Sequence, residues 1–187
     1  PFFHYVAYTA AHWPMHALPE DIAKYEGKYD GGYTSTRANR IQRLKEMKLL
    51  PDHWEPAPMV GNWDEVENKE WEAACMEVYA AMVDNMDQGI GRIVEALKDT
   101  NQFDNTLILF LQDNGGCAEE PGGRSPKIIP GPKEYYAAVG PAWGWAQNSP
   151  FKKHKSRAHE GGISTPCIAW WPGRIQANGI TRQPAHI

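Results

Sequence analysis

Four polar side chains from three distant stretches of the sequence could together bind and cleave an oxyanion ester. Asp113 and Asn114 follow the most apolar run of the chain, residues 106–111, and their oxygens are hard donors of the kind that Ca²⁺ or Mg²⁺ prefers. His12 can hand a proton to a departing oxygen, and Lys155 can neutralise negative charge. A divalent cation, an ammonium and an imidazole on one rim would form a receptor for a tetrahedral oxyanion.

Each of these residues alone has a more ordinary interpretation. Asp-Asn-Gly is common turn chemistry, a histidine after a strand is often structural, and a lysine in a basic segment is usually solvated. The ordered set along the chain is therefore more specific than any one member.

Hydrophobic periodicity predicts the elements that must position these residues. The longest pattern places apolar residues at three- and four-residue steps and has Asn68 as a plausible N-cap. A helix followed by an apolar strand is typical of a mainly parallel sheet covered by helices, so we expect an α/β fold. The expected strands are residues 2–8, 106–111 and 163–171, and the expected helices are residues 36–50 and 70–99.

The stretch of residues 115–150 is rich in glycine and proline and has no clear periodicity. So long a stretch without regular structure is usually functional or mobile. Its Trp143 and Trp145, together with Trp54, could wall a sugar or an aryl ring, or could equally close the core. Both interpretations stay open at the level of sequence.

Composition excludes several classes of protein. The 187 residues carry 23 acidic and 19 basic side chains, a formal charge of −4, which argues against nucleic acid as the partner. No run approaches the roughly 18 apolar residues of a membrane span. Three cysteines without a Cys-x-x-Cys pair form neither a zinc motif nor a disulfide framework, and Cys75 and Cys167 are expected to be buried free thiols.

Five motifs, taken in order, resemble the type I sulfatases, and most closely the bacterial arylsulfatase A-like group. They are Phe-Phe-x-Tyr-x-Ala-Tyr leading to His-Trp-Pro (residues 2–14), the helical segment 79–91, Asp-Asn-Gly-Gly (113–116), Asn-Ser-Pro-Phe-x-x-x-Lys (148–155) and His-Glu-Gly-Gly-Ile-Ser-Thr-Pro (159–166). The resemblance implies an alkaline-phosphatase-like fold, with a mixed, mainly parallel sheet between helices. Since the chain opens inside an expected strand and stops without a closing element, we interpret residues 1–187 as the central and C-terminal part of a catalytic domain, truncated at both ends.

The resemblance also implies roles for the four residues. Asp113 and Asn114 match two ligands of a Ca²⁺ ion, with Mg²⁺ less favoured, and Lys155 matches the lysine that grips a sulfate oxygen. His12 matches the histidine beside the leaving-group oxygen. His16 and His159 receive no role.

One family feature is missing from this sequence. The formylglycine nucleophile, made from a Cys or Ser in a motif that ends in Arg, is expected outside this chain, because Cys167 lacks the arginine. We therefore expect the isolated chain to be inactive and to bind calcium weakly.

The expected function is hydrolysis of an aryl or carbohydrate sulfate ester. A formylglycine- and calcium-dependent phosphonate or phosphodiester hydrolase, and a non-catalytic binding module on the same scaffold, are the alternatives. The family resemblance suggests a periplasmic or secreted protein.

Overall fold

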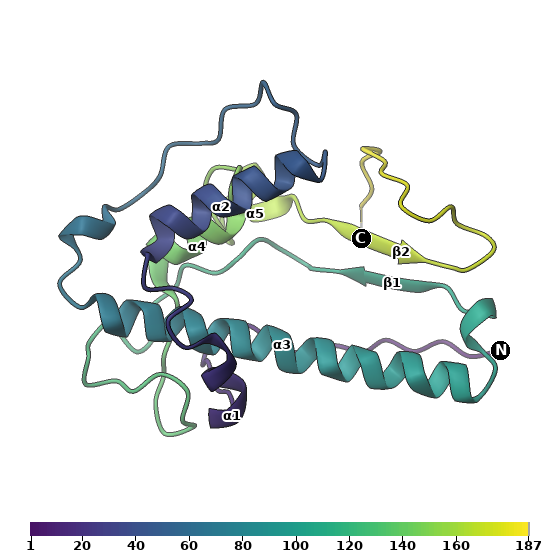
Figure 1. The fold of residues 1–187 in the computed structure, drawn as a ribbon, viewed down its shortest axis with the longest axis horizontal. Helices are drawn as coiled ribbons and strands as arrows, with labels where there is room; N and C mark the ends of the chain where they lie inside the picture. The colour runs from purple at the N-terminus through teal and green to yellow at the C-terminus, as the bar shows by residue number, and fades with distance from the viewer. Residues whose placement is uncertain (187) are drawn as a thin grey trace.

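A single long helix organises the structure, a computed structural model that describes residues 1–186 (Figure 1). Helix α3, Lys69–Asp99, has 31 residues and at 1.5 Å per residue is about 46 Å long. Its buried positions include Trp71, Cys75 and Val78, which recur at helical spacing. The expected helix at 70–99 is confirmed, and Asn68 holds the N-cap position, although its side chain makes no cap hydrogen bond.

Shorter helical elements pack on α3 and on one another. Helix α2, Gly32–Glu46, begins and ends four residues before the helix expected at 36–50, and Tyr33 in its first turn is buried in the core. The remaining helical elements are α1 Pro19–Ile22, η1 Ala23–Tyr25, η2 Trp63–Glu65, η3 Phe103–Asn105, α4 Gly140–Asn148 and α5 Glu160–Ile163. None of the helices within residues 1–186 is both long and apolar enough to cross a bilayer.

The strands after α3 and near the C-terminus form one antiparallel pair. Strand β1, Ile108–Leu111, pairs with β2, Cys167–Trp170, so that Ile108 lies opposite Trp170 and Leu111 opposite Cys167. Among residues 1–186 these are the only strands, and they pair antiparallel, whereas a mixed, mainly parallel sheet is expected from sequence. The third expected strand also starts later than residue 163, because Glu160–Ile163 forms the short helix α5.

The N-terminal segment is not a strand, contrary to expectation. Residues 2–8 are exposed and pair with neither strand of the sheet. The segment instead runs along α3 (Figure 1), where the Tyr8 hydroxyl would lie 2.7 Å from a Cβ added at Gly89. Gly89 therefore permits close packing, whereas Gly91 on the same helix faces open space.

The core centres on the indole of Trp143, for which the sequence allows either a place in the core or a place in a ligand-binding wall. Trp143, on α4, is fully buried, and the rings of Tyr29, Tyr33 and Trp63 meet it edge-on with centroids 5.8, 5.7 and 6.0 Å away. Such edge-to-face contacts stabilise a core beyond the area they bury. Trp145 is also buried and Trp54 is exposed, so the two tryptophans of α4 close the core.

The cysteines divide between core and surface. Cys75 is buried as expected, and burial raises the pKa of its thiol to about 12. Cys167 is exposed, and the expectation that it is buried is wrong because all four residues of β2 are exposed.

Candidate active site

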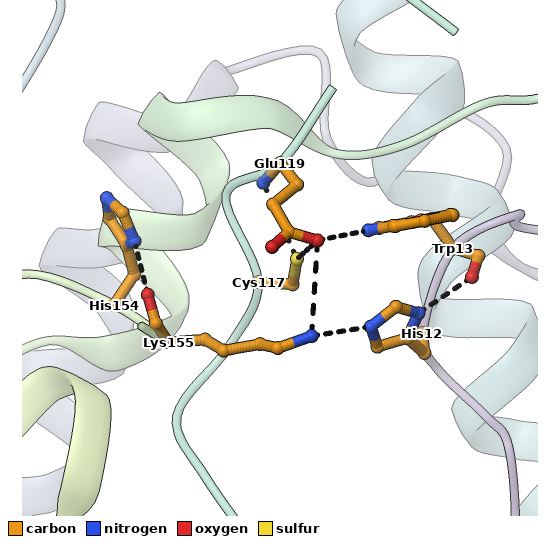
Figure 2. A network of polar contacts seen from close by, with 6 residues as sticks. All are labelled: His12, Trp13, Cys117, Glu119, His154 and Lys155. Atoms are coloured by element: carbon orange, nitrogen blue, oxygen red, sulfur yellow. Dashed lines mark hydrogen bonds and ion pairs between the residues drawn. The ribbon is translucent and has the colours of Figure 1, made fainter. Parts of the chain in front are cut away.

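Two of the four predicted site residues lie in direct contact. The Lys155 ammonium lies 2.8 Å from Nε2 of His12, although 143 positions separate them in the sequence (Figure 2). Both side chains reach the same point from different segments, His12 from the turn after the N-terminal segment and Lys155 from the loop before α5.

The hydrogen bonds of His12 fix its ring and its tautomer. Nδ1 lies 2.7 Å from the Trp13 carbonyl oxygen, which can only accept, so Nδ1 carries the proton. Nε2 then presents its lone pair to the Lys155 ammonium. A second bond, from the backbone N–H of His12 to the Thr9 carbonyl at 3.0 Å, closes the turn.

Lys155 is tied to the loop that follows β1. Its backbone N–H donates to the Gly116 carbonyl at 3.1 Å, and the Gly115 N–H donates to the Gly162 carbonyl at 3.0 Å. A Cβ on Gly115 would overlap the carbonyl of Gly161, so only glycine permits this approach. The two Gly-Gly sequences that look like ordinary turn chemistry thus lock the lysine segment against the Asp-Asn loop.

Helix α2 fixes the other end of the lysine segment. Nε of Arg37 donates to Oγ of Ser149 and Nε of Arg40 donates to the Ser149 carbonyl, both at 2.9 Å. Ser149 is buried, and burial lowers the pKa of both guanidinium groups. These two arginines therefore hold the chain six residues before Lys155.

Asp113 and Asn114 occupy the bend between β1 and Gly115. Asp113 is exposed and Asn114 half-buried, and in the part of the chain that the structure describes neither side chain makes a hydrogen bond or ion pair. Two unpaired hard oxygen donors on one bend fit Ca²⁺, which takes carboxylate and amide oxygens. Their loop contacts the lysine segment directly through Gly115 and Gly116.

Three further residues complete the polar cluster and escaped the sequence reasoning. Nε1 of Trp13 donates to Oε2 of Glu119 at 2.9 Å, the Cys117 thiol lies 3.4 Å from the same oxygen, and the Lys155 ammonium is 4.0 Å from it (Figure 2). The Trp13 hydrogen bond, and then the thiol, lower the pKa of the Glu119 carboxyl. Burial raises the pKa of the Cys117 thiol.

The other histidines that the sequence left without a role lie elsewhere. His16 pairs with the Tyr135 carbonyl at 3.0 Å, and His159 is the exposed N-cap residue of α5. Neither is among the residues that contact Lys155 or Glu119.

The chain is similar to known proteins over nearly its whole length. The family model described as Sulfatase matches residues 1–187. The chain is 36% identical over 199 residues to an uncharacterized sulfatase of Schizosaccharomyces pombe, covering 96% of this chain and 36% of that protein. It is 34% identical over 192 residues to the arylsulfatase of Klebsiella aerogenes, covering 92% and 41% respectively.

A solved structure shares the fold. The crystal structure of Ps i-CgsB in complex with k-i-k-neocarrahexaose aligns with a TM-score of 0.53 and 29% identity, over 95% of this chain and 25% of that one. The chain thus spans well under half the length of these relatives.

Proposed function

The chain belongs to the sulfatase family, and we propose that it forms the central and C-terminal part of the catalytic domain of a sulfuric ester hydrolase. The expected fold class, an alkaline-phosphatase-like α/β fold, is confirmed by the family match and the structural neighbour. The observation that carries the proposed activity is the 2.8 Å contact of Lys155 with His12, beside the loop that holds Asp113 and Asn114.

We assign substrate binding first to Lys155. Its ammonium is partly exposed and lies between an imidazole and a carboxylate, so it can turn to a sulfate oxygen without leaving the cluster. A cation aimed at the oxygens that gain charge stabilises the transition state more than the ground state.

We assign proton transfer to His12. Its Nδ1–H is held by the Trp13 carbonyl, which leaves Nε2 as the only ring atom that can exchange a proton with a ligand. In the structure Nε2 accepts a hydrogen bond from the Lys155 ammonium. During ester cleavage Nε2 would carry a proton and donate it to the departing alcohol oxygen, while the Trp13 carbonyl stabilises the imidazolium.

Asp113 and Asn114 would hold a calcium ion. When bound, this ion supplies Lewis-acid polarisation of a sulfate oxygen. Calcium is favoured over zinc at this bend because both donors are oxygens and one is a neutral amide. The nucleophile, a formylglycine, is expected outside these 187 residues, so the isolated chain should not hydrolyse esters.

The names of the relatives support a sulfate ester as substrate, since one is an arylsulfatase. The test is release of inorganic sulfate from 4-nitrophenyl sulfate by the full-length protein, measured beside hydrolysis of a 4-nitrophenyl phosphonate monoester. Sulfate release that exceeds phosphonate cleavage supports the proposal. Preferential phosphonate cleavage would establish the alternative hydrolase, and inactivity toward both, in protein shown by mass spectrometry to carry formylglycine, would favour the binding module.

A further inference from the structure

A second cluster of potential metal ligands lies next to the proposed calcium loop. One ring nitrogen of His12, Sγ of Cys117 and a carboxylate oxygen of Glu119 all lie within 4.8 Å of one another (Figure 2). We propose that these three side chains bind one thiophilic divalent cation of the Zn²⁺ type, at a site distinct from that of Asp113 and Asn114.

The donor set determines which cation fits. An imidazole nitrogen, a thiolate and a carboxylate are the ligands that zinc takes in proteins, with a solvent molecule as the fourth. Calcium, which takes oxygen ligands, is excluded by the sulfur and the nitrogen. The cysteine spacing did not reveal this site, because the histidine comes from a segment more than one hundred positions away.

Trp13 already orients two of the three ligands. Metal-bound histidines generally donate their other ring N–H to a carbonyl or carboxylate, which fixes the tautomer that ligates. His12 makes this bond to the Trp13 carbonyl at 2.7 Å. The indole of the same Trp13 holds the Glu119 carboxylate at 2.9 Å, so the supporting hydrogen bonds are present before a cation arrives.

A positive charge already lies at this cluster. The Lys155 ammonium is 2.8 Å from His12 Nε2 and 4.0 Å from Glu119. Since both cations need the same lone pair on Nε2, metal and lysine compete for His12. Binding would release the proton of the Cys117 thiol to solvent and displace the lysine ammonium.

Competition for His12 has a functional consequence, which rests on the proposed hydrolase activity. A bound metal would occupy Nε2, the atom that we assign to proton transfer, and would free Lys155 from its partner. Zinc should therefore inhibit the hydrolase by blocking Nε2 of His12, and it should not displace calcium from the loop of Asp113 and Asn114.

Direct binding tests the site without reference to activity. The full-length protein is titrated with Co²⁺, whose bond to a thiolate gives a charge-transfer absorption band, and Zn²⁺ then displaces it. We expect one equivalent per chain, a band that Cys117→Ser abolishes, and a band that Cys167→Ser, the exposed-thiol control, retains.

Variants of the surrounding residues separate this site from adventitious binding. Glu119→Gln and His12→Ala should each weaken Zn²⁺ binding more than about 100-fold, since loss of a group that only orients a ligand costs about 10- to 100-fold. Trp13→Phe should cost about 10-fold, and Lys155→Met should tighten binding. A Co²⁺ band that survives Cys117→Ser, or binding that is indifferent to His12 and Glu119, would overturn the proposal whether or not the protein is a sulfatase.

Discussion

The ammonium of Lys155 and Nε2 of His12 meet at 2.8 Å, and the Trp13 carbonyl holds the opposite nitrogen of the imidazole. This chain of three groups determines which ring nitrogen faces a ligand. It also places a positive charge next to a group that can exchange a proton, and both contribute to the cleavage of a charged ester.

Substitutions of this pair should separate binding of the sulfate from protonation of the leaving group. His12→Gln in the full-length enzyme should lower kcat/KM by about 10²- to 10⁴-fold for an alkyl or sugar sulfate. The loss should be smaller for the sulfate of an acidic phenol, which leaves without a proton. His53→Gln, at an exposed histidine, is the control. An equal loss for both leaving groups would remove His12 from proton transfer.

Lys155→Met should act on both kinds of substrate alike. Removal of one charged donor at a developing oxyanion costs about 10²- to 10³-fold in rate, and the acidity of the leaving group does not enter. Lys152→Met, at an exposed lysine on the same segment, should leave the kinetics unchanged. A Lys155→Met enzyme with wild-type kcat/KM would contradict the role of the lysine.

Calcium binding should depend on the bend after β1. Asp113→Asn keeps the shape of the side chain and removes its charge, so the calcium-dependent rise in melting temperature of the full-length protein should shrink or disappear. A ligand at 100 times its Kd stabilises a protein by about 2.7 kcal/mol. Asp104→Asn, at an exposed acid in η3, should retain the full rise. A chelator that leaves the wild-type melting temperature unchanged would argue against a calcium site.

Alanine substitutions at Gly89 and Gly91 of α3 test whether the N-terminal segment packs against this helix. Gly91→Ala meets open space and should stabilise the protein by up to about 1 kcal/mol through helix propensity. Gly89→Ala gains the same propensity but brings its Cβ 2.7 Å from the Tyr8 hydroxyl, so the gain should be smaller or reversed. Denaturant unfolding measures both, and a double variant with Tyr8→Phe should restore the gain. Equal stabilisation by the two alanines would show that Tyr8 does not pack on α3.

The buried carboxylate of Asp21 should contribute to a fall in stability in acid. The Asp21 side chain accepts hydrogen bonds from Lys24 at 2.7 Å and Asn85 at 3.0 Å, and these, the lysine first, lower its pKa from 3.8. A lowered folded-state pKa gives stability that is complete above the ordinary value and is lost as the pH falls through the lowered one. Asp21→Asn should flatten this acid limb of the unfolding free energy, whereas Asp52→Asn should not.

The long helix was readable from sequence because its apolar stripe repeats over eight turns, and no strand pattern imitates it. The strand expected at residues 2–8 is wrong because a short apolar and aromatic run looks the same in sequence whether it joins a sheet or lies along a helix. Helix α4 is not predicted from sequence because it shows no amphipathic pattern before Gln147 and contains Gly140, Pro141 and Gly144. The burial of Trp143 depends on the rings of Tyr29 and Tyr33, which come from elsewhere in the chain.

The order of the motifs along the sequence predicts part of the candidate site. His12 and Lys155 were proposed together, and the structure brings them into contact. Glu119 was not proposed, since nothing in the sequence separates it from Glu120, which turns instead to Arg124 at 3.3 Å. Glu119 differs from Glu120 in that it accepts a hydrogen bond from the indole of Trp13, which is more than one hundred positions away in the sequence.

A crystal structure of the full-length protein with calcium and sulfate tests the account most directly. We expect an anomalous calcium peak bonded to oxygens of Asp113 and Asn114, and a sulfate oxygen in contact with both Lys155 and His12. A sulfate bound away from these two side chains, or a cation that bypasses the 113–114 bend, would contradict it.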